Sequence, residues 1–500
     1  GIVSRGSTLT ELYGHYIFAD YQSGHVWSMT HNGTTNTGFN YLTTDNNIVG
    51  FAHDPRNGDI LFCDLIEGRI KRLIRTVAST NLIPATLSDT GVFLDTPSLT
   101  PNPGVIGYRL NLPFWSDHAI KTRWFSIPDT NTTITFRPED PWTFPTGMVW
   151  IKHFELETTS GVPASARRIE TRILVKNGDP AGGYGVTYRW GTSTNEAVLV
   201  PDTGLYEPIL IDDGGTIRTQ VWRYPSRAEC LSCHQVGAGF ALGFNTPQLN
   251  RTMNYNGLVT NQIAALGCSG FFTQCVENVV QLPRLVHATN TEYSVEYRVR
   301  SYLQANCANC HFPGGPIPGN FSARLKESLV DANLIDGLLN DELVDINNRV
   351  IVRGSVPHSM LHTRIATLDQ NWRMPPLASM VLDTQNIALV ASWINGEATQ
   401  FQFYHEWASN HFGSATNSLA GRDTDADGDF AVNYLEYLTG TQPTNETDVW
   451  NGPQLALTNQ SVAFQFIRPA RVGADIQRAA SLSAPEWISL EEAVNTRVFS

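Results

Sequence analysis

The chain has 500 residues, enough for about three or four domains, and 41% of them are hydrophobic, enough to fill buried cores. It carries 34 Lys and Arg against 47 Asp and Glu, and this acidic balance argues against a nucleic-acid surface, which needs basic stripes. No run of about eighteen apolar residues occurs, so we expect no membrane-spanning helix.

The two ends of the sequence interrupt strand-like patterns. The chain begins with "GIVSRGSTL" and stops at "NTRVFS", with neither an initiator Met nor a signal peptide. We interpret it as a segment of a longer or processed polypeptide, so the missing signal does not argue against export.

Residues 1–78 are predicted to form short strands. The segments "HYIFADYQSGHVWSM" and "GDILFCDLIEGRIKRL" alternate apolar and polar residues around Gly-containing turns, which predicts two hairpins of the kind that repeat in propeller blades. The phrase "LYGHYIFADYQSGHVWSM" resembles the last blade of the PQQ-dependent soluble glucose (sorbosone) dehydrogenase family. Two hairpins cannot close a propeller, so we expect most of it to lie upstream of Gly1 or to be absent. A small β-meander is the alternative.

Residues 79–225 are rich in Thr, Pro and aromatic residues. Strand-length runs separated by turn residues predict an all-β sandwich or barrel, with strands at "NTTITF", "GMVWIKHFELE", "RRIETRILV" and "GVTYRW".

Helical spacing is confined to the region after residue 290. Residues 226–290 show little helical periodicity, whereas residues 291–396 show it at both ends. One predicted helix places Val295, Val299 and Leu303 on one face. The other places Ile387, Val390 and Ile394 at helical spacing, after a capping Asp383 or Thr384.

Two cysteine motifs use four of the seven cysteines. Both fit C-x-x-C-H, the haem c attachment signature, and they comprise Cys230, Cys233 and His234 at the first site and Cys307, Cys310 and His311 at the second. Thiols at this spacing reach the two vinyl groups on one edge of a porphyrin, and the adjacent His offers an imidazole nitrogen to the iron. A redox disulfide would need a βαβ context, and a shared zinc site would leave the His beside each pair unexplained. The motifs therefore predict two covalent haem c groups.

The second motif has a candidate sixth ligand in "NWRMPPLASMVLD". Two prolines follow Met374, and because Pro fixes its own φ and restrains its predecessor, they hold the thioether in a stiff loop. Helix, C-x-x-C-H, Met loop and helix is the plan of a small cytochrome c, with His311 and Met374 as axial ligands. A buried core role for Met374 is the alternative, and Met380 is the better core candidate.

A wider resemblance covers about residues 105–396. The segments "LPFWSDHAIKTRWFSIP", "YPSRAECLSCH", "ALGFNTPQLN", "QANCANCHFPGG" and "RMPPLASMVLD" resemble a family of exported bacterial dihaem c-type cytochromes, in which the β domain and two haem sites often follow a propeller of the sugar-dehydrogenase type. The resemblance implies electron transfer. We therefore expect a multidomain chain, mostly β with an α-helical cytochrome c domain. Its parts are a propeller blade (1–78), an all-β domain (79–225), a first haem segment packed on it (226–290), a cytochrome c domain (291–396), a helix and Ca²⁺-loop linker (401–445) and a truncated β domain (446–500).

The first motif lacks a Met-Pro loop. We therefore expect its haem to pack against the β domain, which then supplies the sixth ligand. The candidates are His153, His118 and Met253, of which we favour His153. A five-coordinate iron is the alternative and would indicate ligand or peroxide chemistry.

The acidic segment "DTDADGDFAVNYLEY" spaces its side chains like an EF-hand loop. With Asp425 at position one, the Ca²⁺ ligands are Asp425, Asp427, Asp429, Asn433 and Glu436. Position six is then Phe430 where Gly is usual; starting at Asp423 restores Gly but places Tyr434 at twelve. The stretch also resembles single Ca²⁺ loops near the C-termini of large exported bacterial proteins. A solvated acidic turn is the alternative.

The remaining cysteines fit an oxidising compartment. Cys268 and Cys275 are close enough to form a disulfide, and Cys63 is predicted to be a buried free thiol. Separately, Arg167, Arg168 and Arg172 either pair with haem propionates or form ordinary surface ion pairs.

Together these features predict a periplasmic or extracellular bacterial electron carrier with two haem c groups and Ca²⁺, and with PQQ only if a complete propeller precedes the chain. Its partner is a redox protein or an attached sugar or alcohol dehydrogenase; we expect neither nucleic acid nor a membrane span. We assign no catalytic residues. The alternatives are the tail of a PQQ-dependent dehydrogenase, or a self-assembling extracellular haem filament.

Overall fold

The computed structural model describes residues 1–21, 24–45, 47–75, 83–177, 182–315, 320–340, 345–377 and 379–450, together with the backbone of four short strands beyond residue 450. The chain divides into two compact units. Unit 1 comprises Gly1–Glu277, Gly314–Pro316 and Pro375–Val381, and unit 2 comprises Asn278–Pro313, Ile317–Met374 and Leu382–Ser500. Within the described residues, no helix has both the length and the apolar character needed to cross a membrane. The boundaries of the six smaller domains stay predictions.

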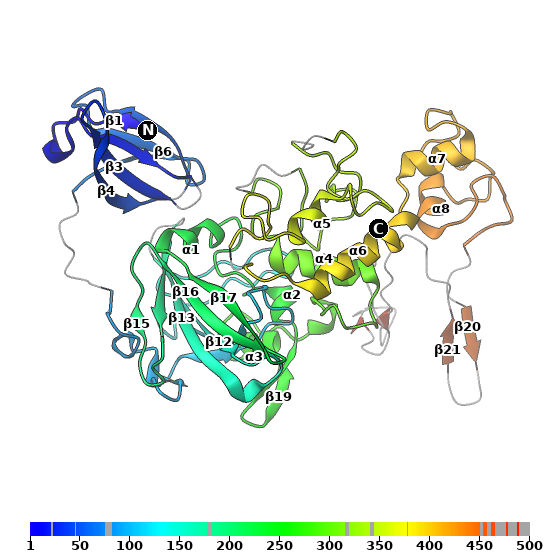
Figure 1. Cartoon of the computed structure of the whole chain (residues 1–500). Coiled ribbons are helices and arrows are strands. Elements are labelled where there is room, and N and C mark those ends of the chain that lie inside the picture. The colour runs from blue at the N-terminus through cyan, green and yellow to red at the C-terminus, as the bar shows by residue number, and fades with distance from the viewer. Residues whose placement is uncertain are drawn as a thin grey trace. The chain divides into compact units, whose positions relative to one another are not determined.

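The first seven strands of unit 1 form two antiparallel sheets (Figure 1, blue). They are β1 (Ile2–Val3), β2 (Tyr16–Ala19), β3 (His25–His31), β4 (Asn36–Thr44), β5 (Ile48–His53), β6 (Ile60–Asp64) and β7 (Arg69–Arg72). Both predicted hairpins are confirmed, since β2 pairs with β3 and β6 with β7. Alternating apolar residues of both sheets share one core, which includes Ile17, Val26, Ile60 and Phe62. Among the described residues there is no complete propeller.

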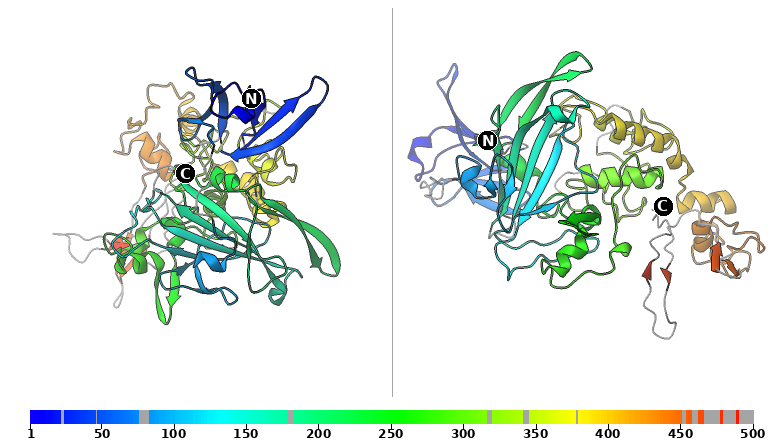
Figure 2. Two further views of the ribbon diagram at one scale, coloured as in Figure 1. Left: turned by 90° about the vertical axis from the view of Figure 1, so that its left-hand side faces the viewer. Right: turned by 90° about the horizontal axis from the view of Figure 1, so that it is seen from below.

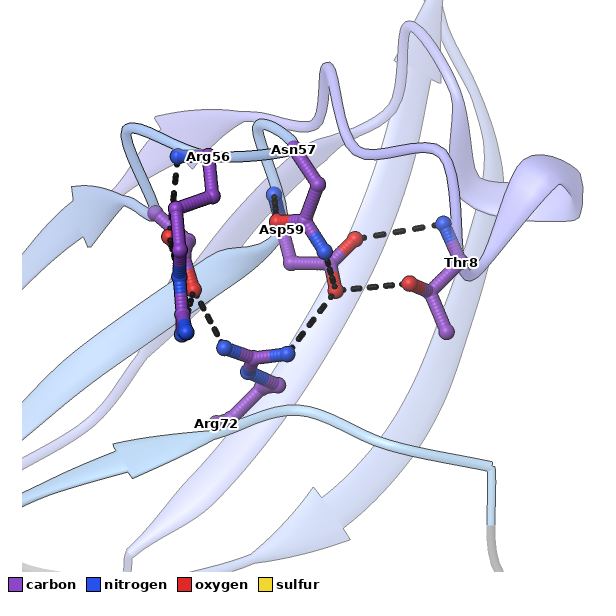
Figure 3. A network of polar contacts seen from close by, with 6 residues as sticks. Thr8, Arg56, Asn57, Asp59 and Arg72 are labelled. Carbon is purple, nitrogen blue, oxygen red and sulfur yellow. Dashed lines mark hydrogen bonds and ion pairs between the residues drawn. The ribbon is translucent and has the colours of Figure 1, made fainter.

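A polar network fixes β7 against the turn before β6 (Figure 3). Arg72 forms ion pairs with Asp54 and Asp59, whose side chains are buried. Thr8 donates its hydroxyl to Asp59 at 2.7 Å, and Asn57 donates its amide to the same carboxylate at 2.8 Å. These charge-assisted hydrogen bonds connect the N-terminal segment to the second sheet. Cys63, on β6, is a half-buried thiol and not the fully buried one that we predicted.

The centre of unit 1 is a six-stranded antiparallel sheet in the order β10-β11-β12-β13-β14-β15, which Figure 2 shows from two further directions. The strands are β10 (Ile106–Tyr108), β11 (Ile120–Ser126), β12 (Val149–Glu157), β13 (Ala166–Lys176), β14 (Gly183–Arg189) and β15 (Val198–Leu199); the short pair β8 (Phe93–Asp95) and β9 (Thr100–Pro101) precedes them. Three of the four predicted strands are confirmed. The fourth, "NTTITF", makes only one isolated bridge, between Thr135 and Thr143, because the prolines that follow it lack the N–H needed for a ladder.

Side-chain alternation gives this sheet two distinct faces. On β12, Trp150, Lys152 and Phe154 point to one face, called here the Trp150 face, and Ile151 and His153 point to the other, the Ile151 face. The Ile151 face is covered by a core that includes Leu87, Phe93, Trp124, Tyr188 and Trp190.

The hairpin of β16 (Leu205–Asp213) and β17 (Thr216–Tyr224) packs on the sheet at Phe154. Its apolar side chains Ile209, Ile211, Trp222 and Tyr224 share a core with Phe154. The predicted sandwich is therefore a six-stranded sheet with a two-stranded hairpin packed on it.

The segment after β17 contains more helix than we predicted. It forms α1 (Arg227–Cys233), α2 (Thr246–Leu249), β18 (Thr252–Tyr255), β19 (Leu258–Asn261) and α3 (Gln262–Cys268). These helices are too short for a periodicity signal and depend on local caps, such as Ser226 and Glu229 at the start of α1. The predicted disulfide Cys268–Cys275 is present.

Unit 2 is helical over most of its regular structure. It contains α4 (Val295–Asn306), α5 (Met360–Ile365), α6 (Thr384–Asn395), α7 (Tyr404–Phe412) and α8 (Asn433–Thr439). Both predicted helices are confirmed as α4 and α6, which pack together through buried Val299, Leu303, Val390 and Ile394. Asp383 is the N-cap of α6.

Beyond residue 450 the described backbone forms two antiparallel pairs, β20 (Gln454–Leu457) with β21 (Val462–Gln465) and β22 (Gln477–Arg478) with β23 (Ile488–Ser489). The rest of the predicted β domain at 446–500 lies mostly outside the described residues. Short 3-10 helices lie at Thr10–Leu12, Ser88–Thr90, Pro163–Ser165, Val279–Gln281 and Glu397–Gln400. The protein as a whole is mixed, mostly β, with several antiparallel sheets and some helices.

Candidate functional site: two cysteine motifs and an acidic loop

The first cysteine motif forms a single helical turn at the end of α1. The helix starts in a capping box, in which Ser226 accepts the Glu229 N–H and Glu229 accepts the Ser226 N–H. At its end, the His234 N–H donates to the Cys230 carbonyl at 3.0 Å. Residues three and four apart share one helix face, so this turn presents Cys230, Cys233 and His234 on the same side.

His234 is held in a tautomer suited to metal binding. Burial lowers the pKa of His234 to about 4, so the imidazole is neutral. Its Nδ1 lies 2.6 Å from the Phe240 carbonyl, and because a carbonyl can only accept, Nδ1 carries the proton. The lone pair is therefore on Nε2, as in metal-ligating histidines whose other nitrogen donates to a carbonyl.

The Cys230 thiol packs directly against β14. An added Cβ at Gly185 would lie 2.7 Å from Cys230 Cβ and 2.8 Å from its Sγ, so only Gly permits this approach. Burial raises the pKa of the Cys230 thiol to about 12. On the same face of the sheet, the Trp150 ring contacts the rings of Phe240 and Phe244. The thiol is therefore desolvated, and the charges of Arg172, Glu170 and Glu229 act on it.

The second motif repeats the same turn after α4. The Cys307 N–H donates to Leu303 O at 2.8 Å, and the Cys310 and His311 N–H groups both donate to Cys307 O, at 3.0 and 2.9 Å. None of the four motif cysteines forms a disulfide, and burial raises the pKa of Cys307 to about 12. Two motifs from different parts of the chain thus share one local geometry.

His311 and Met374 both adjoin Arg364 at the end of α5. Burial, assisted by the Arg364 charge, lowers the pKa of His311 to about 4. The His311 ring stacks on Phe321 at 4.4 Å, and its Nδ1 is buried with no hydrogen-bond partner among the described residues. The half-buried Met374 donates its N–H to Arg364 O at 2.8 Å. Arg364 therefore acts on the His311 imidazole through its charge and on the Met374 backbone through its carbonyl.

The structure does not bring His153 to the first motif. Its side chain is fully buried on the Ile151 face, where Nδ1 lies 2.8 Å from Thr171 Oγ1 and the ring packs edge-on against Trp190. Cys230 packs on the opposite, Trp150 face, against Gly185. Burial lowers the pKa of His153 to about 3, which agrees with a neutral core histidine.

The other two candidates for the sixth ligand lie in turns and hairpins. His118 is exposed, with a positive φ of 66°, and its ring packs edge-on against Trp115 at 4.7 Å. Met253 is half-buried on β18. The sixth ligand of the first site stays a prediction; of the three candidates, His153 lies on the face of the sheet opposite Cys230.

The predicted propionate arginines separate in the structure. Arg167 pairs with Glu207, and Arg168 donates to Thr194 O and lies over Trp190. Of these three arginines, only Arg172 acts electrostatically on Cys230. Sequence reasoning missed the Phe240 carbonyl and the Arg364 connection, because neither carries a sequence signal.

The acidic loop between α7 and α8 gathers three carboxylates. Oxygen atoms of Asp425, Asp427 and Asp429 all lie within 4.8 Å of one another. Asp425 accepts the N–H groups of Gly428 and Phe430 at 2.8 and 3.0 Å. Among the described residues, no other set of three His, Cys, Asp or Glu ligand atoms is this close.

Two buried side chains of α8 follow the acidic loop. Glu436 is 1% exposed and Asn433 fully buried, and both Glu436 oxygens and Asn433 Oδ1 have no hydrogen-bond partner among the described residues. Burial and the three aspartates raise the pKa of Glu436 to about 7. Phe430 occupies position six at φ 75° with its side chain 97% exposed, so the turn forms there without Gly. Three of the five predicted ligands, Asp425, Asp427 and Asp429, are therefore gathered at one point, and their charges act on the buried Glu436 carboxylate.

Comparisons with family models, with curated proteins and with solved structures found no match. The resemblance to dihaem cytochromes and to a propeller blade stays a prediction that rests on sequence motifs.

Proposed function

We propose that the protein is a dihaem c-type cytochrome that transfers electrons in the periplasm or outside the cell. One observation carries the proposal: both C-x-x-C-H motifs form the same helical turn, with the thiols not disulfide-bonded and the histidines neutral. Haem c supplies reversible one-electron chemistry at its iron when bound. The Cys268–Cys275 disulfide supports an oxidising compartment.

The residues of each motif have separate tasks. The two thiols of each motif would hold a porphyrin through two thioether bonds, formed by addition of each S–H across a vinyl C=C bond, so that atoms and electrons would balance without a further reactant. His234 and His311 each offer a neutral imidazole nitrogen, and the Phe240 carbonyl holds the His234 ring in orientation. At the second site, Met374 offers a thioether from a loop anchored on Arg364. The resemblance to a propeller blade leads us to propose an attached or partner dehydrogenase as the electron donor.

The haem count tests this proposal. The alkaline pyridine spectrum of the purified chain should show two c-type haems per polypeptide. A count of zero overturns the proposal, and a count of one removes one motif from it.

The Met374 assignment has its own test. Met374→Ala should abolish the near-infrared band of methionine-ligated ferric haem and lower the reduction potential, whereas Met380→Ala in the same loop should leave both unchanged. A methionine band that survives Met374→Ala contradicts the assignment.

We also propose that the acidic loop binds Ca²⁺ through Asp425, Asp427, Asp429, Asn433 and Glu436. The buried and unpartnered carboxylate of Glu436 favours this proposal over a solvated turn, since an uncompensated buried charge beside three aspartates is costly. Ca²⁺ would compensate that charge and stabilise the contact between α7 and α8, whose core includes Trp407 and Tyr437.

A further inference from the structure

A row of hydrogen-bond donors crosses the Trp150 face of the central sheet. The row runs across five adjacent strands, from β10 to β14. In the register, each residue is the cross-strand partner of the next one in the series Tyr108, Arg123, Lys152, Arg172 and Thr187. We call these five residues the donor row. Its three middle members are cations, and like charges in directly opposed cross-strand positions destabilise a sheet.

The charges of the donor row are only partly compensated. Arg172 pairs with Glu170, which is fully buried. Lys152 contacts the face of the Phe154 ring at 4.9 Å, and burial together with Arg123, Lys121 and Arg172 lowers its pKa well below the ordinary value. Glu229 also acts on Arg172 but is ion-paired with Arg223, so among the described residues Glu170 is the carboxylate that pairs with the donor row.

Several donor atoms in the row have no acceptor. Arg123 Nη2, Arg172 Nε and Thr187 Oγ1 are buried without a hydrogen-bond partner among the described residues. Arg123 is 5% exposed and Thr187 3%, so water cannot serve freely in place of an acceptor. Buried donors are normally satisfied, and a row of unsatisfied ones with excess positive charge indicates an anionic ligand.

The donor row lies next to the first cysteine motif. One pleat along the sheet, the neighbouring row on the same face is Phe125, Trp150, Leu174 and Gly185, and Cys230 packs against Gly185. Lys152 and Arg172 both act electrostatically on His234, and Arg172 also acts on Cys230. The rings of Phe240 and Phe244 pack on Trp150 and Phe125, so a flat ligand attached to Cys230 and Cys233 would lie beside this apolar row, where the charges of Lys152 and Arg172 act.

We propose that the donor row binds a ligand with two carboxylate groups. Guanidinium groups match carboxylates in planar, paired hydrogen bonds, and three cations minus Glu170 leave a surplus that two carboxylates compensate. Resting on the proposed function, we assign these carboxylates to the two propionates of the haem held by Cys230, Cys233 and His234. A free dicarboxylate is the other source of the same chemistry.

The test measures the reduction potential of the first haem alone, in a Cys307→Ala, Cys310→Ala background. In the haem-bound protein the two propionates would keep Lys152 protonated. Lys152→Gln then removes a positive charge that favours the reduced haem, so the potential should fall by about 59 mV, a tenfold change in the one-electron equilibrium. Arg168→Gln is the matched control, because Arg168 lies on the neighbouring strand β13 but contacts Trp190 of the other core. Lys152→Gln also relieves charge repulsion in the row, so it should fold. Equal shifts in the two variants overturn the propionate assignment while the proposed function stands.

A second measurement separates the two sources of carboxylate. If the chain carries no haem, the proposed function fails. Thermal melts with succinate then test whether the donor row binds a free dicarboxylate. Stabilisation of the wild type that Lys152→Gln abolishes supports a dicarboxylate site. No stabilisation of the haem-free wild type, or equal stabilisation of the variant, overturns the donor row as an anion site.

Discussion

At the scale of single residues, a buried carboxylate distinguishes the acidic loop from an ordinary solvated turn. The sequence spaces Glu436 at position twelve of a loop, and any solvated acidic segment can do the same. In the structure this carboxylate is 1% exposed, faces three aspartates and has no hydrogen-bond partner among the described residues. The physical argument for Ca²⁺ comes from that burial, since a surface aspartate cluster alone would be screened by water.

Glu436→Gln should weaken Ca²⁺ binding about tenfold or more, about 1.4 kcal/mol, because the amide loses the charge and one of the two oxygen ligands. The same change should raise the melting temperature of the Ca²⁺-free protein, because it removes a buried charge that three aspartates repel. Titration calorimetry and melts in chelator measure the two effects.

Asp423→Asn serves as the control for this prediction. Asp423 is exposed and belongs to the other possible register of the loop, so its replacement should change Ca²⁺ affinity little. Equal losses in the two variants, or a wild type that binds no Ca²⁺, would contradict the assigned ligands.

At the scale of elements, Glu207 ties the β16–β17 hairpin to the central sheet. It accepts hydrogen bonds from Arg167 on β13, Arg189 on β14 and Tyr224 on β17. From the sequence, Arg167 was a candidate partner for a haem propionate. Only the packing of the β16–β17 hairpin on the sheet shows that Arg167 pairs with Glu207 instead.

Glu207→Gln should lower the free energy of unfolding at neutral pH by about 1.5–3 kcal/mol, because it replaces charge-assisted hydrogen bonds with neutral ones. Burial alone would raise the pKa of Glu207, but the hydrogen bonds from Arg189, Tyr224 and Arg167 outweigh it, and the pKa lies below its ordinary value of 4.5. The folded state therefore holds the carboxylate's stabilisation above pH 4.5 and loses it as the pH falls through the lowered pKa. Denaturant unfolding from pH 7 to pH 3 should show the two proteins converging at acid pH.

Glu157→Gln is a matched control, since Glu157 lies at the end of β12 and accepts the Gly161 N–H. Its unfolding curve should follow the wild type at both pH values. A constant gap between wild type and Glu207→Gln down to pH 3 would show that the carboxylate charge is not what stabilises the hairpin.

At the scale of the whole molecule, the two cysteine motifs belong to different compact units. Cys230 and Cys233 lie in unit 1, and Cys307 and Cys310 lie in unit 2. Each motif has its own buried surroundings: β14 and Phe240 at the first, Phe321 and Arg364 at the second. This separation predicts that each haem attaches independently of the other.

Cys230→Ala with Cys233→Ala should therefore reduce the haem count from two to one and preserve the methionine-ligated signal. Cys307→Ala with Cys310→Ala should also leave one haem but abolish that signal. Pyridine spectra and intact-mass measurement check both outcomes. Loss of both haems from either double variant would show that the two attachment sites depend on each other.

Local sequence patterns were enough to predict several helices, strands and one disulfide of this protein. The helices α4 and α6, the Asp383 cap, the strands β12, β13 and β14, and the Cys268–Cys275 disulfide follow from periodicity, capping and spacing, which act over a few residues. The two C-x-x-C-H motifs needed no tertiary information, because one helical turn contains all three side chains of each. Local patterns overestimated the strand at "NTTITF" and underestimated the capped helix α1, where prolines and side-chain caps prevail over propensity.

Tertiary structure alone decided which face of the sheet meets the first motif. Alternation along β12 separates His153 from Trp150, but only the packing of Cys230 on Gly185 shows that the motif lies on the Trp150 face. The donor row likewise exists only through register, because Tyr108, Arg123, Lys152, Arg172 and Thr187 come from five strands and become neighbours when the ladder forms. Cross-strand register is a non-local property set by packing and turns, and a single sequence carries no direct record of it.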